Sequence, residues 1–95
     1  MRSVVWADSA RRDMARIDDW FADVDPQFAD RLGLAAIAAA RFLIDFPFAG
    51  PAVPDSILRK WPVPRTDYRL FYVVTESGLE IVRVRHVRED RDDDE

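Results

Sequence analysis

The amino-acid sequence predicts an α+β domain in which two N-terminal helices pack on a small antiparallel sheet, with the element order β-α-α-β-β-β. Two segments before residue 46 repeat apolar residues at the spacing of a helix face. Two later segments, 68–74 and 79–87, are rich in aromatic and β-branched residues and flank a short Ser77-Gly78 turn. The 95 residues are enough for one hydrophobic core, so we expect a single domain over residues 1–88.

The first elements are a short strand and an amphipathic helix. Residues 2–6 are rich in β-forming residues, and Asp8 and Ser9 after them are residue types that cap a helix N-terminus. The charged residues that follow, Asp13 among them, are expected mostly away from the apolar face. That face consists of residues at steps of 4, 3, 4 and 3: Ala10, Met14, Ile17, Phe21 and Val24.

The second helix is predicted from Asp25-Pro26, an N-cap followed by proline at the first helical position, to about Asp45. Phe46-Pro47 and Gly50-Pro51 end it, because proline restricts the residue before it and glycine tolerates unusual backbone angles. Its apolar stripe comprises Phe28, Leu32, Ala35, Ala39, Phe42 and Phe46. Residues 56–63 predict a further strand, which Pro62 and Pro64 confine to a sheet edge or end.

The charge is unevenly distributed along the chain. Net charge is −3 over residues 1–56, +4 over residues 57–88 and −5 over residues 89–95. The strand-rich part therefore offers a basic surface to an acidic partner, or simply solvated strand faces. The acidic segment 89–95 is expected to be disordered by self-repulsion.

Composition also narrows the location and the chemistry. The chain has no cysteine, which fits a reducing cytoplasm and excludes disulfides and thiolate sites. Its longest weakly polar run is too short to cross a bilayer, so we expect a cytoplasmic protein with no membrane partner. A glycine-rich phosphate loop, HExxH, a histidine pair and G-x-S-x-G are all missing from the sequence, so we expect no metal site and no cofactor.

The two C-terminal strands carry the candidate functional residues. Strict alternation puts Arg69, Phe71 and Val73 on one face of the first strand, opposite Tyr68, Leu70, Tyr72 and Val74. In the second strand it groups Ile81, Arg83 and Arg85 against Val82, Val84 and His86. Because both faces are largely apolar, we expect a partner, a loop or another copy of the chain to cover the face that the helices leave open.

Each of these residues has a functional and a structural interpretation. Arg69 is suited to bind phosphate or to pair with Asp67 or Glu80. His86 is a candidate proton carrier near neutral pH or a structural residue at a strand end. Tyr72, like Tyr68, is able to stack on bases or to pack in the core with its hydroxyl at the rim.

Taken in order, several short pieces resemble the RelE/ParE superfamily of toxins from type II toxin–antitoxin pairs. The pieces are Ser9-Ala10, Asp25-Pro26-Gln27-Phe28-Ala29, Phe46-Pro47 to Gly50, Tyr68-Arg69-Leu70-Phe71-Tyr72 and Ile81-Val82-Arg83-Val84-Arg85-His86. The P-x-x-G segment, the YR-x-x-Y strand and the I-x-R-V-x-H ending look most like the ParE branch.

The resemblance implies a toxin neutralised by a ParD-like antitoxin, with one of two activities. ParE-like toxins inhibit DNA gyrase, whereas RelE-like toxins cleave mRNA on the ribosome. Lys60 is the only lysine and no tyrosine follows the last strand, so we favour a non-catalytic gyrase inhibitor. The alternatives are a ribosome-dependent endoribonuclease and a binding module without toxicity.

RNA cleavage and partner binding are expected to use different sets of residues. An endoribonuclease would use Arg69, Arg83 and Arg85 to stabilise charge on the scissile phosphate and His86 to move protons. Partner binding is assigned to seven residues of the strand-rich part: Arg59, Lys60, Trp61, Arg69, Tyr72, Arg83 and Arg85.

Overall fold

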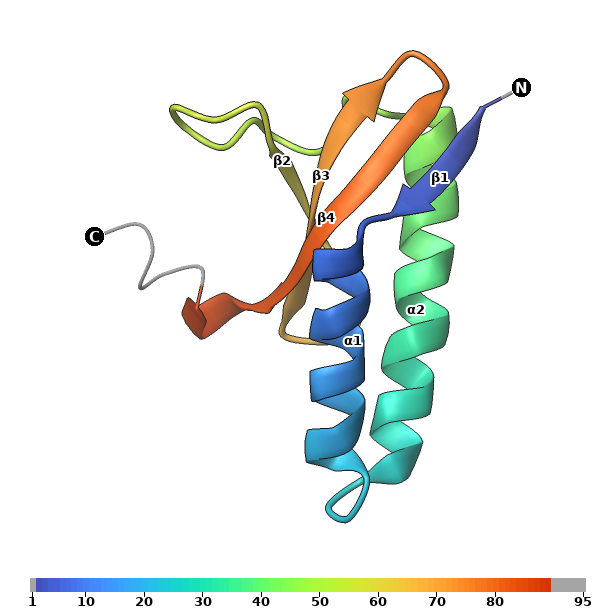
Figure 1. Ribbon diagram of the computed structural model, residues 1–95, viewed down its shortest axis with the longest axis vertical. Helices are drawn as coiled ribbons and strands as arrows, with labels where there is room; N and C mark the ends of the chain where they lie inside the picture. The colour runs from blue at the N-terminus through green and yellow to red at the C-terminus, as the bar shows by residue number, and fades with distance from the viewer. Residues whose placement is uncertain (1, 90–95) are drawn as a thin grey trace.

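The computed structural model describes residues 2–89, which fold with the predicted order of elements (Figure 1). The elements are β1 (Ser3–Trp6), α1 (Asp8–Phe21), α2 (Pro26–Asp45), β2 (Arg59–Pro62), β3 (Tyr68–Thr75) and β4 (Gly78–His86). Residues 87–89, at the end of the described part, are helical. Residues 90–95, most of the acidic segment expected to be disordered, lie outside it.

The sheet has the strand order β1-β4-β3-β2. β2 and β4 both run antiparallel to β3, as expected from the short connections. β1 instead runs parallel to β4, so the sheet is mixed, and the prediction of a wholly antiparallel sheet was wrong in this respect. A parallel neighbour needs a long crossover, and here both helices and two strands separate β1 from β4 in the sequence.

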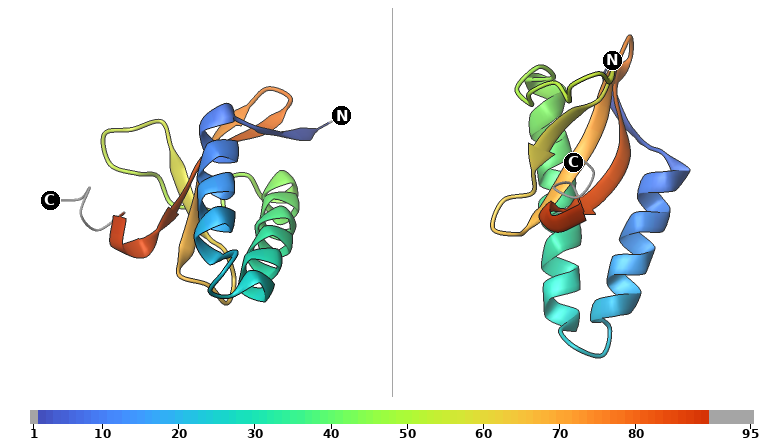
Figure 2. Two further views of the ribbon diagram at one scale, coloured as in Figure 1. Left: turned by 60° about the horizontal axis from the view of Figure 1, so that its bottom comes forward. Right: turned by 90° about the vertical axis from the view of Figure 1, so that its left-hand side faces the viewer.

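Both helices pack against one face of the sheet and leave the other face open, as the side view of Figure 2 shows. The core lies between the two layers and includes Leu32 and Leu43 of α2, Leu70 and Tyr72 of β3, and Leu79, Ile81 and Val84 of β4. We call the face of the sheet turned away from the helices the outer face. This two-layer arrangement leaves the strand arginines as candidates for contact with a partner.

The two helices begin differently. α2 begins as predicted, because the Asp25 carboxylate accepts a hydrogen bond of 3.0 Å from the backbone N–H of Phe28, and Pro26 occupies the first turn. α1 has Ala7 at its N-cap and no side-chain cap. The expectation that Asp8 or Ser9 caps α1 was therefore wrong, since the Ser9 hydroxyl bonds to β4 instead.

Gly78 lets β1 lie close to the end of the β3–β4 hairpin. Its φ of +145° is a conformation that favours glycine, and a Cβ at this position would overlap the backbone of Ser3. The N–H of Ser3 donates to the carbonyl of Ser77 over 2.7 Å. The turn therefore fixes both the hairpin and the start of the parallel pair.

Candidate functional site

The start of α1 forms hydrogen bonds with the edge of β4 just beyond the point where β1 ends. The last register pair of the two strands is Trp6 with Ile81, after which Ala7 donates its N–H to the carbonyl of Ile81 over 2.9 Å. The Ser9 hydroxyl then donates to the carbonyl of Val82 over 2.6 Å. The backbone of the N-cap residue and the side chain of Ser9 thus satisfy carbonyl groups of β4 that a strand would otherwise pair.

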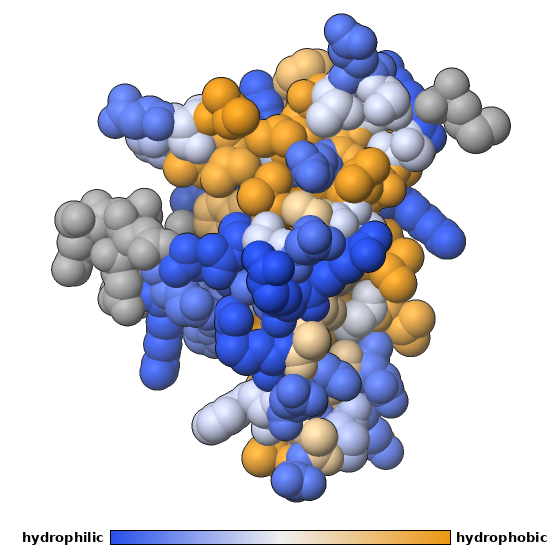
Figure 3. Space-filling view, in the orientation of Figure 1, coloured by the Kyte–Doolittle hydropathy of each residue, from blue (hydrophilic) through white to orange (hydrophobic). Residues whose placement is uncertain are grey.

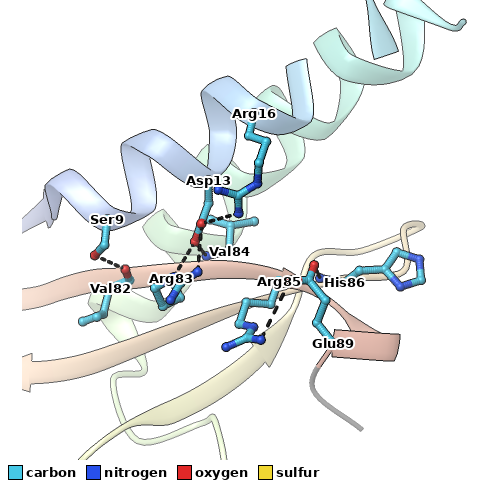
Figure 4. Close-up of polar contacts among 9 residues, drawn as sticks. All are labelled: Ser9, Asp13, Arg16, Val82, Arg83, Val84, Arg85, His86 and Glu89. Carbon is cyan, nitrogen blue, oxygen red and sulfur yellow. Dashed lines mark hydrogen bonds and ion pairs between the residues drawn. The ribbon is translucent and has the colours of Figure 1, made fainter. Parts of the chain in front are cut away.

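Asp13, one helical turn after Ser9, also bonds to the edge of β4 (Figure 4). Its carboxylate accepts from the backbone N–H of Val84 over 2.9 Å and from Arg16 over 2.8 Å. Only 1% of Asp13 is exposed, so the prediction that it lies away from the apolar face was wrong. Its position three residues after Ala10 and four before Ile17, on the buried stripe of α1, is the sequence signal that could have shown this.

Arg83 completes the group around Asp13. Its Nε and Nη2 donate to the two carboxylate oxygens over 2.8 and 3.1 Å. Burial raises the pKa of Asp13, but the hydrogen bonds from Arg83, Val84 and Arg16 outweigh burial and hold the pKa below its ordinary value. The guanidinium of Arg83 therefore ties β4 to α1, and its side chain keeps about a third of its surface exposed.

A β-bulge explains why strict alternation fails in β4. Phe71 pairs with Arg83 and the next residue, Tyr72, pairs with Ile81, so Val82 is an extra residue on β4. Ile81 and Val84 both lie in the core, although strict alternation would put them on opposite faces. The predicted grouping of Ile81 with Arg83 and Arg85 was therefore wrong.

The outer face holds a basic cluster made of Lys60, Arg69 and Arg85. Arg69 and Arg85 are register partners, and they lie on the side opposite the core residues Leu70 and Val84. Lys60 shares that side because it is the register partner of Phe71 on β3. Three strands thus bring three of the predicted site cations together on one surface.

His86 lies apart from the basic cluster. Its ring meets Tyr68 edge-on at 5.2 Å between centroids, and its Nδ1 accepts from the N–H of Arg88 over 3.1 Å. Tyr68 in turn contacts Phe28 of α2, so His86 belongs to the helix side of the sheet. His86 is therefore separated from the three arginines predicted for RNA cleavage, since Arg69, Arg83 and Arg85 share the other side of the sheet by register and the guanidinium of Arg83 bonds to Asp13 of α1.

A small hollow opens beside His86, lined by Asp25, Arg65, Asp67 and Tyr68 among others. Burial raises the pKa of Tyr68, and the nearby carboxylates of Glu89 and Asp67 raise it further. The phenol therefore stays protonated at neutral pH and is a hydrogen-bond donor rather than a base.

Tyr72 was predicted to bind a partner, but it is a core residue. It is 0% exposed, its hydroxyl donates to the carbonyl of Pro47 over 2.7 Å, and the same oxygen accepts from the N–H of Gly50 over 3.1 Å. Burial raises the pKa of Tyr72. This side chain therefore anchors the loop after α2 and has no surface to offer a partner.

Arg59 and Trp61 of β2 border an aromatic surface next to the end of α2. Arg59 donates to the carbonyl of Gly50 over 2.7 Å and lies 4.9 Å from the ring centre of Phe48. Trp61 stacks on Phe42 at 5.3 Å. The exposed members of this surface, which sequence reasoning did not select for binding, are Phe42, Phe46 and Phe48.

The surface hydropathy shows where apolar and hydrophilic side chains gather on the molecule. In the view of Figure 3, hydrophobic surface gathers over the upper part of the sheet and a hydrophilic band crosses the middle of the molecule. Between α1 and α2, a shallow groove is lined mainly by apolar side chains, including Met14, Ile17, Leu34 and Ile37. The molecule therefore offers apolar and basic surfaces on different faces.

Within residues 2–89, neither helix combines the length and the apolar character that a bilayer-spanning helix needs. In the same part of the chain, no three His, Cys, Asp or Glu side chains gather as metal ligands would.

The geometry agrees with comparisons to known proteins. Residues 4–91 match the family described as the ParE toxin of the type II toxin–antitoxin system parDE. Toxin RelE2 of Caulobacter vibrioides is 31% identical over 86 residues, which cover 90% of this chain and 96% of the relative. A solved structure entitled "Chromosomal ParDE TA system from P. aeruginosa" matches with a TM-score of 0.74 and 19% identity, covering 90% of this chain and 96% of the other.

The chain therefore belongs to the RelE/ParE family of type II toxins, within the group described by the ParE model. The resemblance noted in the sequence is confirmed, and so is the α+β fold.

Proposed function

We propose that this toxin inhibits DNA gyrase by binding to it and that a cognate ParD-like antitoxin neutralises the toxin. The observation that carries this proposal is the separation of the candidate catalytic residues. Arg69 and Arg85 lie on the outer face, Arg83 bonds to Asp13, and His86 packs on Tyr68 at the helix side. General acid–base catalysis needs its groups within hydrogen-bond reach of one scissile phosphate, whereas a binding inhibitor needs only a complementary surface.

The two kinds of surface suit an antitoxin that uses two kinds of segment. The apolar groove between α1 and α2 fits the apolar face of an amphipathic helix, and Leu34 at this groove is 71% exposed. The basic cluster of the outer face fits an extended acidic segment. The match to a structure entitled as a ParDE system supports an antitoxin of this class.

The test is supercoiling of relaxed plasmid by purified gyrase with increasing amounts of the full-length toxin. We expect loss of supercoiling or accumulation of cleaved DNA, reversed by an equimolar amount of the antitoxin encoded beside the toxin gene. Arg69→Ala on the outer face is the test variant in this assay, and Arg12→Ala on the exposed surface of α1 is its matched control, because it removes the same charge away from the outer face.

Full gyrase activity at a large molar excess of folded toxin would contradict the proposal. Cleavage of mRNA in a translating ribosome extract would then identify a ribosome-dependent endoribonuclease. A chain that binds antitoxin but affects neither gyrase nor translation would be a binding module without toxicity.

A further inference from the structure

The basic cluster of the outer face concentrates like charges. Arg69 and Arg85 are direct register partners on neighbouring antiparallel strands, and like charges placed opposite each other are unfavourable. Lys60 on β2 adds a third positive charge to the same face. A negatively charged segment that binds here lowers this repulsion, whether the segment belongs to the same chain or to a partner.

The described chain ends beside this cluster. Glu89 turns back on β4, since its Oε1 accepts from the N–H of His86 over 3.3 Å and its Oε2 lies 3.8 Å from Nη2 of Arg85. In Figure 4, Arg85 and Glu89 both extend below the end of the β4 ribbon, and a dashed line joins them. Glu89, the last described residue, therefore lies beside Arg85.

The remaining segment, 90–95, is strongly acidic and long enough to cover the cluster. It has the sequence DRDDDE, with five carboxylates and one arginine. Six extended residues reach up to about 20 Å. Lys60 lies two strands away from Arg85 and is offset from it by two residues along β3, which together give a distance of about 12 Å.

We propose that residues 90–95 dock on the basic cluster of the same molecule and compete there with the acidic segment of a protein partner. Residues Lys60, Arg69 and Arg85 then form an internally occupied binding surface, which a partner gains only by displacing the chain's own C-terminus. This inference deepens the proposed function, because the occupied face is the one assigned above to the acidic segment of the antitoxin. Its physical basis, charge complementarity and reach, does not depend on gyrase.

Lys60 makes the docking directly measurable, because it is the only lysine in the chain. A carbodiimide joins a carboxylate to an amine in contact with it and adds no spacer. We expect intramolecular cross-links between Lys60 and carboxylates of residues 90–95, identified by mass spectrometry of the monomeric product. They should disappear in about 1 M NaCl, where the Debye length falls to about 3 Å.

Lys60→Arg is the matched control, since it keeps the positive charge but removes the reactive amine. Cross-links from Lys60 only to carboxylates outside residues 90–95, or only to a second molecule, would overturn the proposal. The absence of any Lys60 cross-link in the wild-type chain at low salt would overturn it as well.

Competition is tested by neutralising the segment in the full-length chain with Asp92→Asn, Asp93→Asn and Asp94→Asn together. The probe is a fluorescently labelled peptide of ten glutamates at low salt. If the segment occupies the cluster two-thirds of the time, the triple variant should bind the probe about threefold more tightly.

The control variant Asp19→Asn, Asp23→Asn and Asp55→Asn makes the same change in net charge at exposed positions of α1 and two loops. It should gain clearly less affinity than the C-terminal variant. Equal gains in probe affinity for both variants would show a general effect of net charge and would contradict the proposed competition. Neither readout involves gyrase or toxicity, so failure of this inference and failure of the proposed function are distinguishable.

Discussion

Arg83 and Asp13, 70 residues apart in the sequence, join β4 to α1 through two hydrogen bonds of 2.8 and 3.1 Å. The same carboxylate accepts a hydrogen bond from the backbone N–H of Val84, so one buried side chain bonds both to the edge of β4 and to the arginine on that strand. This contact holds the guanidinium of Arg83 at the junction with α1, whereas Lys60, Arg69 and Arg85 lie on the outer face.

Replacing Asp13 by alanine should destabilise the fold. The change leaves the N–H of Val84 without its acceptor, and an orphaned buried donor costs about 1–3 kcal/mol. Arg83 is partly exposed and able to turn to water, so we expect a loss of about 2–3 kcal/mol rather than the larger cost of a fully buried orphan charge. Urea denaturation of the wild type and the variant measures the difference.

The exposed neighbour Asp18 provides the control for this prediction. Asp18→Ala removes the same type of side chain from α1 and should change the free energy of unfolding by less than about 0.5 kcal/mol. Equal effects of the two substitutions would show that the Asp13 contacts contribute little.

The lowered pKa of Asp13 also predicts a pH dependence. A carboxyl whose pKa is lower in the folded state stabilises the fold above its unfolded pKa, here near the ordinary value of 3.8, and loses that stabilisation as pH falls further. The stability difference between the wild type and Asp13→Asn should therefore be constant above about pH 5 and shrink below about pH 4. Urea midpoints from pH 2 to 7 give this difference, and a difference unchanged at pH 2 would contradict the argument.

Gly50 should tolerate no side chain. A Cβ there would lie 2.5 Å from the carbonyl oxygen of Lys60 and 2.8 Å from the hydroxyl of Tyr72. Gly50→Ala is therefore expected to destabilise the fold by about 1–3 kcal/mol through overpacking. The measurement is the melting temperature together with the urea midpoint.

Gly33 is the matched control for Gly50. A Cβ at Gly33 meets nothing within 4 Å, and glycine inside a helix is less favourable than alanine. Gly33→Ala should therefore stabilise the protein by about 0.5–1 kcal/mol. Opposite signs for the two substitutions are the expected outcome, and destabilisation by both would contradict the helix argument.

Arg69→Ala should weaken binding without unfolding the chain. The residue lies on the outer face of β3, opposite Arg85, and the substitution removes one charge from the proposed partner surface. We expect antitoxin affinity to fall by about 1 kcal/mol or more, which is about fivefold or more. The circular dichroism spectrum should stay that of the wild type, and Arg12→Ala should bind antitoxin normally.

Two other outcomes would change this interpretation. A lost circular dichroism signal in Arg69→Ala would make Arg69 a structural residue. Unchanged affinity for antitoxin with an intact fold would remove the outer face from the proposed antitoxin surface.

Much of the fold follows from local patterns. The Asp25-Pro26 cap and the end of the helix at Asp45 are where the sequence predicts them, because capping and proline restriction act within a few residues. The β3–β4 hairpin is also found nearly at its predicted bounds. Lys60, Arg69 and Arg85 belong to the seven residues predicted for partner binding and lie on one face, whereas Arg83 of the same set bonds to Asp13, and local sequence did not distinguish the two cases.

By itself, then, the sequence determined the element order, the helix ends and the family, since these depend on periodicity, capping and short motifs read along the chain. The tertiary structure alone decided the parallel pairing of β1, the bulge at Val82, the burial of Asp13 and the use of Tyr72 in the core. Each of these depends on groups brought together from distant parts of the chain. A charge or a hydroxyl is buried or exposed according to the partner that the fold supplies, and local sequence does not encode that partner.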